Sequence, residues 1–405
     1  MERPRQAVIL AGGRGRRMRP FTDTAPKHMF PFHGRPFLEY LIEQLRDQGF
    51  RRIVLLLGYL ADATREHFAD GLHLGIQIDS CVTPPECETG ERLRTAAPLL
   101  DPVFFLLYCD NYWPFHFHRL WQPFCSRRAL AQMTVYENAD QYSRPNAAIG
   151  SNGLVAIYDR SRSHPALHAI DIGYTLMDRS VLDLLPGGAV PLEAVYPELA
   201  ARGQLGAYTT GHRYYSVGTP ERLTLTRSFL SWPKAVLLDR DGVLNPRPPV
   251  GGYVRNRDEW HWLDGALEAL DLFHEAGYRV IVCSNQAGVA RGMVNQSDLA
   301  EIDRRMKQEA RARGASIDAA YYCPHDWDSP CRCRKPKPGM LFDAQRDFHL
   351  DLTRTWFIGD DDRDAQAAEA AGCPFAMVSS TQSLLTIARC LIHAEQATTP
   401  WQTVS

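Results

Sequence analysis

The sequence predicts a two-domain α/β protein in which each domain is built on a largely parallel sheet. Short apolar runs, typical of buried strands, alternate with segments whose apolar residues recur every three or four positions, as on one face of a helix. This alternation begins twice, near the N-terminus and again after Ser231-Trp232-Pro233. The 405 residues suffice for two hydrophobic cores. We therefore expect domains over residues 1–232 and 234–390, followed by a tail over 391–405.

The first domain opens with a strand expected at residues 8–10, which leads into a glycine-rich loop. A helix is predicted after this loop, because five apolar side chains repeat at helical spacing: Phe37, Leu38, Leu41, Ile42 and Leu45. Continuous apolar runs predict two more buried strands, at 53–57 and 103–107. The second of these runs leads to Asp110.

The second domain repeats the pattern, with three strands expected at 235–238, 279–283 and 355–358. Helices are expected around residues 266–273 and over 297–313, where apolar residues again recur at helical spacing. Gly277 and Gly314 follow these helices, at the position where glycine commonly ends a helix.

Composition and charge exclude several classes of protein. Hydrophobic residues make up 45% and charged residues 23%, which excludes a disordered chain, a collagen-like fibre and a small disulfide scaffold. The 45 Lys and Arg nearly balance the 47 Asp and Glu, so a broad basic surface for nucleic acid is not expected. Since no apolar stretch has the length of a membrane span or a signal-peptide core, we expect a cytoplasmic protein without membrane partners. Its 10 cysteines should then be buried thiols or metal ligands rather than disulfides.

Polar side chains follow each of the three strands expected in the second domain. Asp239 and Asp241 follow the first strand, Ser284 follows the second, and Asp360 with Asp364 follows the third. Parallel strands end at one edge of a sheet, where α/β proteins bind ligands. Carboxylates gathered at that edge repel one another unless a cation lies between them, and oxygen ligands suit Mg²⁺. The sequence therefore predicts a magnesium site, which we assign to Asp239, Asp241 and Asp360.

A short loop further along carries four soft metal ligands: Cys323, His325, Cys331 and Cys333. Three thiolates and an imidazole suit tetrahedral Zn²⁺. Because four protein ligands would close the coordination sphere, we expect the zinc to be structural. Two disulfides, or thiols without a metal, are the alternatives.

The second domain resembles the haloacid-dehalogenase (HAD) phosphatase superfamily. The signature segments of that superfamily occur in order: Asp239-Arg240-Asp241-Gly242, Ser284, Lys335, and Gly359-Asp360 with Asp364. The resemblance implies a Rossmann-like fold without a large cap, with Asp239 as the nucleophile that forms an aspartyl-phosphate and Asp241 as acid and base. Ser284 and Lys335 would hold the phosphoryl oxygens while Mg²⁺ neutralises their charge. Lys337 is a second candidate for the lysine role, but Lys335 stands in the Cys-x-Cys-Arg-Lys-Pro arrangement of the most similar relatives.

Within this superfamily, residues 234–380 resemble the heptose 1,7-bisphosphate phosphatases. The likeness is carried by the zinc loop and by three further segments: Tyr253-Val254, residues 285–292 and residues 334–339. It implies substrate contacts from Asn285 and, for a second phosphate, from Arg334. Histidinol-phosphate phosphatases share the zinc loop in a shorter version that matches this chain, so the choice of substrate stays open. Asp361 stands where relatives carry a lysine, and this anion is expected to weaken phosphate binding.

In the first domain, Gly12, Gly13 and Gly15 form a loop whose backbone amides can approach the phosphates of a nucleotide. This signal is weak alone, but Pro26-Lys27 and Gly34-Arg35-Pro36 follow it. Together these segments resemble the sugar-1-phosphate nucleotidylyltransferases, over about the first 230 residues. The resemblance implies a Rossmann-like fold of the GT-A type that joins a nucleoside triphosphate to a sugar 1-phosphate and releases pyrophosphate.

The same resemblance implies roles for individual residues of the first domain. Arg17 and Lys27 would neutralise the phosphates, and Asp110 would hold Mg²⁺. Gly173 and Glu193 would lie near the sugar.

One position departs from this family. Ser216 stands where a second metal-binding aspartate is usual, and a hydroxyl is a poorer Mg²⁺ ligand than a carboxylate. Cys109 likewise replaces a common glycine before Asp110. Three outcomes stay open: metal binding by Asp110 with substrate phosphates alone, metal binding through another carboxylate, or loss of transferase activity.

The two resemblances together predict a bifunctional enzyme of nucleotide-activated heptose synthesis, which would supply lipopolysaccharide or other cell-surface polysaccharides. The second domain would remove the 7-phosphate of D-glycero-D-manno-heptose 1,7-bisphosphate. The first would couple the resulting 1-phosphate to a nucleotide, taken from GTP by family analogy. Two alternatives are an N-terminal domain that binds a sugar nucleotide without catalysis, and a histidinol-phosphate phosphatase.

Overall fold

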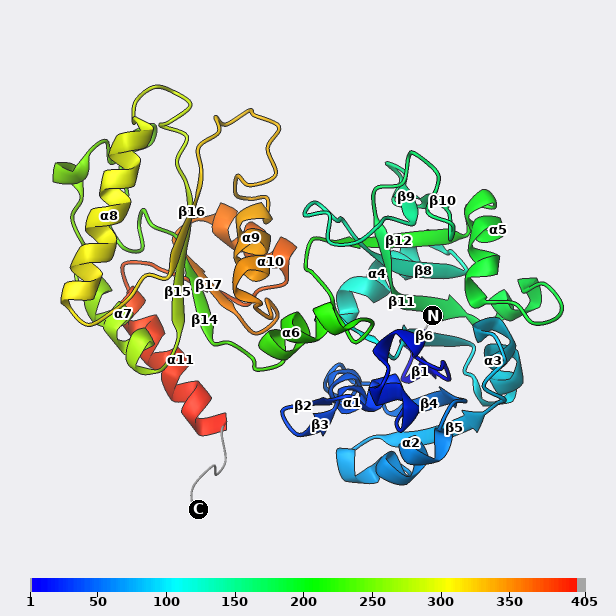
Figure 1. The fold of residues 1–405 in the computed structure, drawn as a ribbon. Helices are drawn as coiled ribbons and strands as arrows, with labels where there is room; N and C mark the ends of the chain where they lie inside the picture. Colours follow the sequence, from blue (N-terminus) through cyan, green and yellow to red (C-terminus); the bar gives the residue numbers. More distant parts are fainter. Residues whose placement is uncertain (1, 399–405) are drawn as a thin grey trace, which may run out of the picture. The chain divides into compact units, whose positions relative to one another are not determined.

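A boundary between Ser231 and Trp232 divides the chain into two units, each with its own main sheet (Figure 1). The computed structural model describes residues 2–398. No helix in this part of the chain is long and apolar enough to cross a membrane.

The N-terminal unit is built on a seven-stranded sheet of order β12-β8-β11-β6-β1-β4-β5. Its strands are β1 (Gln6–Ala11), β4 (Arg52–Leu57), β5 (Gln77–Val82), β6 (Val103–Tyr108), β8 (Ala131–Tyr136), β11 (Ile170–Asp178) and β12 (Leu205–Thr210). The three strands predicted in this half lie inside β1, β4 and β6, which are parallel to one another. β11 departs from the predicted parallel arrangement, because it runs antiparallel to both of its neighbours, β6 and β8.

Helices and short ribbons surround this sheet. The helices are α1 (Phe37–Asp47), α2 (Ala61–Phe68), α3 (Thr89–Ala96), α4 (Phe117–Arg127), α5 (Tyr196–Ala201) and α6 (Pro220–Phe229). The two-stranded ribbons pair β2 (Pro31–Phe32) with β3 (Arg35–Pro36), β7 (Asn111–Tyr112) with β13 (Tyr215–Ser216), and β9 (Ala147–Ile149) with β10 (Val155–Tyr158). The stripe predicted for α1 is confirmed, because all five of its side chains are buried.

The C-terminal unit contains a five-stranded, fully parallel sheet of order β16-β15-β14-β17-β18. Its strands are β14 (Ala235–Leu238), β15 (Arg279–Asn285), β16 (Ala319–Cys323), β17 (Trp356–Gly359) and β18 (Phe375–Met377). β15 is longer than predicted, so Ser284 and Asn285 are its last two residues. The predicted strands 235–238 and 279–283 lie within β14 and β15, and β17 covers most of the third.

Helices cover both faces of this sheet (Figure 1). They are α7 (Ala266–Glu275), α8 (Gln296–Ala312), α9 (Gly339–Phe348), α10 (Asp362–Ala371) and α11 (Leu384–Thr398). Val236 and Leu238 of β14 point into one core with α7, α8 and α11, whereas Ala235 and Leu237 point into another with α9 and α10. Within the described residues, only loops and one short 3₁₀ turn lie between β14 and α7, where a cap domain would be inserted.

The predicted tail over 391–405 is wrong for its first part, because α11 runs through residue 398. Ile387 and Ala388 are buried against the core, and Leu391 and Ile392 continue the same apolar face. Burial of this apolar face therefore holds α11 against the core of the unit. The rest of the predicted tail lies outside the described residues.

Candidate active sites

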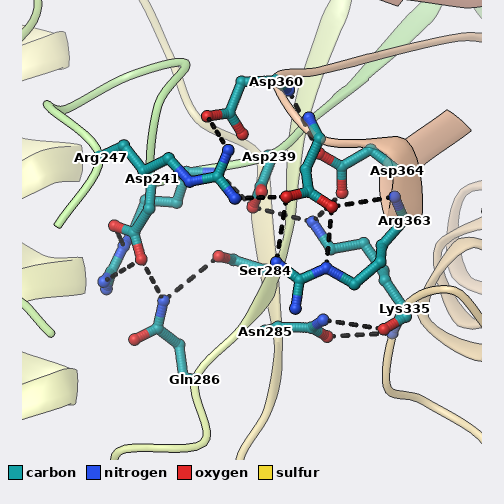
Figure 2. Close-up of polar contacts among 12 residues, drawn as sticks. Asp239, Asp241, Arg247, Ser284, Asn285, Gln286, Lys335, Asp360, Arg363 and Asp364 are labelled. Atoms are coloured by element: carbon teal, nitrogen blue, oxygen red, sulfur yellow. Dashed lines mark hydrogen bonds and ion pairs between the residues drawn. The ribbon is translucent and has the colours of Figure 1, made fainter. Parts of the chain in front are cut away.

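The carboxyl ends of β14, β15 and β17 bring together one group of predicted site residues. These strands are neighbours in the sheet, so Asp239, Ser284 and Asp360 meet at one edge (Figure 2). Asp239 and Ser284 are buried, with 8% and 1% of their surface exposed. A pocket at this edge is also lined by Asp241, Asn285, Arg334, Lys335 and Asp364.

Two glycines allow the backbone to approach the carboxylates closely. Gly242 has a φ of +88°, and a Cβ on it would lie 1.9 Å from Oδ2 of Asp360. A Cβ on Gly359 would lie 2.5 Å from the side chain of Asp364. Any other residue at either position would displace a carboxylate of the site.

Lys335 is fixed between two carboxylates. Its Nζ lies 2.9 Å from Oδ1 of Asp239 and 2.7 Å from Oδ1 of Asp364, and only 2% of the side chain is exposed. Burial alone would lower the pKa of Lys335, but Asp239 and Asp364 raise it above its usual value. Burial raises the pKa of Asp239, while Lys335 opposes that rise. The ammonium therefore offsets the cost of keeping Asp239 ionised in a buried position.

The carboxylates that come together differ from the predicted magnesium ligands by one residue. Oxygens of Asp239, Asp360 and Asp364 lie within 4.8 Å of one another, whereas the Asp241 carboxylate is not in this group. Asp364 is the third residue of α10, where its Oδ2 accepts hydrogen bonds from the backbone amides of Asp360 and Asp361, both at 3.2 Å. Helix geometry thus folds Asp364 back toward the end of β17.

Asp241 faces different partners. Nε and Nη2 of the fully buried Arg240 donate to its two oxygens at 2.9 and 3.1 Å, and Gln286 Nε2 donates to Oδ2 at 2.9 Å. Burial would raise the pKa of Asp241, but Arg240 and Gln286 lower it overall. The free protein therefore holds Asp241 as a carboxylate that lines the pocket, and its role as a magnesium ligand stays a prediction.

The backbone of Lys335 is held by Asn285. Asn285 Nδ2 donates to the Lys335 carbonyl and Lys335 N donates to Asn285 Oδ1, both at 3.0 Å. The side-chain amide of Asn285, which is predicted to contact the substrate, therefore holds the backbone of Lys335 in this structure. Lys337 Nζ instead donates to the carbonyl of Cys331 at 2.6 Å, so it is Lys335, not Lys337, that contacts Asp239.

Asp361, the anion expected to weaken phosphate binding, is paired with two arginines. Arg363 donates to its two oxygens through Nε at 2.8 Å and Nη2 at 3.1 Å, and Arg247 Nη2 also donates to it. Asp361 also caps α10 by accepting a hydrogen bond from the Arg363 amide. Two guanidinium groups therefore neutralise its charge.

The four predicted zinc ligands converge on one point. Cys323 Sγ lies 3.8 Å from Cys331 Sγ and 3.5 Å from His325 Nδ1, and Cys333 Sγ lies 3.2 Å from the same nitrogen. Tetrahedral zinc with Zn–S bonds of about 2.3 Å separates its sulfur ligands by roughly 3.8 Å. A disulfide needs about 2.05 Å, so the Cys323–Cys331 distance matches metal ligation and not a disulfide.

In the N-terminal unit, Lys27 pairs with the aspartate predicted to bind metal. Lys27 Nζ lies 2.6 Å from Asp110 Oδ2, and about a fifth of each side chain is exposed. Burial would lower the pKa of Lys27, but Asp110 raises it overall. Arg17 is exposed nearby, and its charge acts in the opposite direction on the same lysine.

A buried arginine, Arg92, donates hydrogen bonds to the backbone of the loop with Gly12, Gly13 and Gly15 and to a neighbouring strand. Arg92 donates to the carbonyls of Gly12 at 3.3 Å and Leu57 at 2.9 Å. A Cβ on Gly12 would lie 2.4 Å from the Arg92 guanidinium carbon, whereas Gly13 has open space around it and Gly15 adopts a φ of +59°. The glycines therefore permit both the packing of the loop and its exposed amides.

Ser216 lies next to the predicted metal aspartate. It pairs with Asn111 across the β7–β13 ribbon, and the amide of the next residue, Val217, donates to the Asp110 carbonyl at 2.9 Å. Among residues 2–398, Asp110 is not part of any group of three potential metal ligands. The side chain at this position is therefore a hydroxyl next to Asp110, and the predicted magnesium role of Asp110 stays a prediction.

Gly173 and Glu193 lie on either side of one tyrosine. Tyr108 Oη donates to Glu193 Oε1 at 2.9 Å, and a Cβ on Gly173 would lie 2.7 Å from the Tyr108 ring. Gly173 sits where the register of β11 shifts, with its amide bonded to Asp171 Oδ1 at 2.8 Å. Burial raises the pKa of Asp171 to about 6. Two carboxyl groups thus gather where the sugar was predicted to bind.

Several residues that organise these sites carry no predicted role. Arg240 lies between Asp239 and Asp241, and Gln286 follows Ser284-Asn285, so their places in the sequence could have indicated a role in the site. Asp364 was placed at the sheet edge, but its contact with Lys335 depends on the start of α10. Nothing local marks Arg92, because its partners come from other segments of the chain.

Comparisons with known proteins agree with this geometry. The family model described as Nucleotidyl transferase matches residues 6–143, and the model described as HAD-hydrolase-like matches residues 332–386. The D-glycero-beta-D-manno-heptose-1,7-bisphosphate 7-phosphatase of Photorhabdus laumondii is 40% identical over 144 residues, which cover 34% of this chain and 75% of that protein. The protein of the same name from Pseudomonas aeruginosa is 35% identical over 154 residues, covering 38% and 85%.

A solved structure of a different kind of protein shares the fold of part of this chain. This structure, assigned as a glucose-1-phosphate thymidylyltransferase from Bacillus anthracis, has a TM-score of 0.50 and 18% identity, and it covers 55% of this chain and 94% of that one. The likeness is one of fold alone. The chain therefore belongs, through its C-terminal unit, to the HAD-type family of D-glycero-beta-D-manno-heptose-1,7-bisphosphate 7-phosphatases, and a nucleotidyltransferase domain precedes that unit.

Proposed function

We propose that the C-terminal unit removes the 7-phosphate of D-glycero-D-manno-heptose 1,7-bisphosphate, and that the N-terminal unit transfers a nucleotide to the resulting heptose 1-phosphate. The observation that carries the first activity is the buried Asp239 held against Lys335 beside Ser284 and Asp360. The relatives that share this half of the chain are named for that substrate.

The phosphatase reaction would proceed in two displacements. In the form of the enzyme in which Asp241 has taken up a proton, a carboxylate oxygen of Asp239 attacks phosphorus, and the bond to the sugar oxygen breaks as Asp241 gives that oxygen this proton. Water then attacks the phosphorus of the aspartyl-phosphate and loses its proton to Asp241, which releases orthophosphate and restores Asp239. Arg240 and Gln286 favour the carboxylate form of Asp241 that this second step needs.

The remaining pocket residues would hold the group in transfer. Lys335 and Ser284 line the same pocket as Asp239 and carry donors suited to phosphoryl oxygens. The carboxylates of Asp239 and Asp360 fit a hard divalent cation, and bound Mg²⁺ would neutralise the charge of the phosphoryl oxygens. Arg334 lines the same pocket and is available for the second phosphate of a bisphosphate.

We also assign structural zinc to Cys323, His325, Cys331 and Cys333, on the basis of their mutual distances. The loop between these ligands leads directly to Arg334 and Lys335. Zinc would therefore fix the segment that presents both cations to the pocket.

For the N-terminal unit, Lys27 and Arg17 would neutralise the triphosphate above the glycine loop, with GTP as the expected donor. Asp110 would hold Mg²⁺ together with substrate phosphates, because Ser216 provides no carboxylate. This same observation favours a second candidate, an N-terminal unit that binds the sugar nucleotide without catalysis. Release of pyrophosphate from GTP and heptose 1-phosphate supports transfer, whereas nucleotide binding without release supports the second candidate.

The phosphatase substrate is tested by comparing kcat/KM for the heptose bisphosphate and for histidinol phosphate with one Mg²⁺-loaded preparation. We expect the heptose bisphosphate to be favoured by at least about tenfold, because Arg334 offers a charge-assisted bond to its second phosphate. Faster turnover of histidinol phosphate would contradict the proposal.

A further inference from the structure

Two arginines that the phosphatase mechanism does not use line the C-terminal pocket. Arg247 belongs to the loop that follows β14, and Arg363 belongs to the first turn of α10. About half of each side chain is exposed. The fold therefore brings two guanidinium groups from distant parts of the unit to one pocket.

Asp361 aligns both guanidinium groups. It takes two hydrogen bonds from Arg363, through Nε and Nη2, and another from Nη2 of Arg247 (Figure 2). Asp361 is itself fixed as the N-terminal cap of α10. The two-point contact holds the plane of the Arg363 guanidinium, since a paired guanidinium and carboxylate are coplanar forks.

Arg247 and Arg363 together carry more positive charge than Asp361, the carboxylate they share, can neutralise. Lys335 is shared between Asp239 and Asp364, and Asp241 is paired with Arg240. Arg247 and Arg363 share Asp361, and Arg247 Nη1 also reaches Asp360 Oδ2 at 3.3 Å. Because Asp360 belongs to the group of carboxylates that fits a divalent cation, a bound cation would compensate its charge and leave the two arginines with one anion.

Arg363 also lines the same pocket as Asp239. Its bonds to Asp361 raise the pKa of Arg363, burial opposes that rise, and Asp364 and Asp239 add to it. Its third nitrogen, Nη1, makes no hydrogen bond to residues that the structure describes. A donor is thus available in the pocket that contains Asp239.

We propose that Arg363, aligned by Asp361 and supported by Arg247, is a phosphate-binding residue that contacts the phosphoryl group in transfer at Asp239. The inference rests on the proposed phosphatase function, and it adds a cation to Lys335 and Ser284. Its ligand is a phosphate dianion, either as part of the substrate or as released orthophosphate.

The test is the binding of orthophosphate to the Mg²⁺-loaded full chain, measured by calorimetry. Arg363→Gln should weaken binding by about 10- to 100-fold, the effect expected when a charge-assisted hydrogen bond is lost. Arg255→Gln is the matched control, because Arg255 makes a similar two-point contact with Glu259 outside the pocket. The control should stay within twofold of the unsubstituted chain, and an Arg363→Gln affinity equally unchanged would overturn the proposal.

Kinetics separate the phosphoryl group in transfer from the second phosphate. Arg363→Gln should raise KM to a similar extent for heptose 1,7-bisphosphate and heptose 7-phosphate, because both present the same reacting group. A rise confined to the bisphosphate would contradict the proposal. Since orthophosphate binding needs no turnover, failure of the phosphatase assignment would appear separately, as binding without hydrolysis.

A conservative variant separates a binding role from a structural one. Arg363→Lys keeps the charge but cannot hold Asp361 and phosphate with one fork, so orthophosphate binding should weaken several-fold while the thermal midpoint stays near that of the unsubstituted chain. If Arg363→Gln does not fold, this variant alone decides. An unchanged affinity in Arg363→Lys would then overturn the proposal.

Discussion

At the scale of single residues, the phosphatase site depends on the contact of the buried Asp239 with Lys335, which opposes the rise in the pKa of Asp239 that burial causes. Lys335 provides the charge, and Asp364 and Asn285 hold Lys335 in place. A buried ion pair is costly to break, because the remaining partner is left uncompensated. Replacing any one of these residues should therefore lower phosphatase activity more than the small change in side-chain size suggests.

Asp239→Asn should abolish phosphatase turnover, with kcat reduced by a factor on the order of 10⁴ or more, because an amide cannot serve as the nucleophile. Release of orthophosphate from the heptose bisphosphate measures this loss. Nucleotide binding by the same variant is the control and should be unchanged. Turnover within tenfold of the unsubstituted chain would exclude Asp239 as the nucleophile.

Asp364→Asn isolates the contact between Asp364 and Lys335. An asparagine oxygen can still accept the amides of Asp360 and Asp361, so the start of α10 should be preserved. Loss of the charge leaves Lys335 with Asp239 alone, and we expect kcat to fall by about 10- to 100-fold. Steady-state kinetics measure the fall, and an unchanged kcat would contradict the assigned positioning role.

Asp171 should make the stability of the N-terminal unit depend on pH. Its pKa is raised to about 6, mainly by burial, whereas the unfolded chain has the ordinary value near 4. The folded unit therefore binds the proton more tightly, and stability is lost as pH rises from about 4 to 6. Asp171→Asn should remove this loss and stabilise the unit above pH 6 by about 1–3 kcal/mol. Urea unfolding at pH 5 and pH 8 measures the difference, and equal effects at both values would contradict it.

At the scale of elements, the loop between β16 and α9 connects the proposed zinc site to Lys335. Cys323 ends β16, and Cys331 and Cys333 directly precede Arg334 and Lys335. A fixed conformation of this loop should therefore depend on bound zinc more than on apolar packing.

Cys331→Ser should lower the zinc content from about one per chain and destabilise the C-terminal unit by about 3 kcal/mol, because a coordinate bond is lost. Metal analysis and thermal unfolding measure both effects. Cys390→Ser is the control, since Cys390 is an exposed thiol on α11, away from the four ligands. Full zinc content in Cys331→Ser would contradict the zinc assignment.

The elements that were predicted from the sequence share one property, which is a continuous buried pattern. β14, β15 and the α1 stripe are buried along their length, so apolar periodicity identifies them. β16 and β18 are edge strands that are only partly buried, and their patterns are weak. No helix was predicted over α11, whose apolar face is interrupted by polar residues.

The same distinction applies to the sites. Motif residues at strand ends, such as Asp239 and Asp360, meet because the topology of a parallel sheet requires it. Arg247 and Arg363 converge on Asp361 only through the path of a loop and the cap of a helix, which no local pattern encodes. The sequence therefore predicts the reacting groups better than the groups that orient them.

At the scale of the whole molecule, the chain joins two units whose proposed reactions share an intermediate. The heptose 1-phosphate released by the phosphatase is the acceptor that the nucleotidyltransferase would use. Each proposed site pairs a lysine with an aspartate, Lys27 with Asp110 and Lys335 with Asp239, within a chain whose net charge is only −2.

The most direct test gives the full chain Mg²⁺, GTP and heptose 1,7-bisphosphate and follows orthophosphate, pyrophosphate and the nucleotide sugar together. We predict that orthophosphate appears first and that pyrophosphate and nucleotide-heptose follow in equal amounts. Asp239→Asn should stop all three products from the bisphosphate, yet still form pyrophosphate and nucleotide-heptose from heptose 1-phosphate. An unsubstituted chain that releases no orthophosphate, or that forms nucleotide-heptose from the bisphosphate while Asp239→Asn does so equally well, would contradict the account.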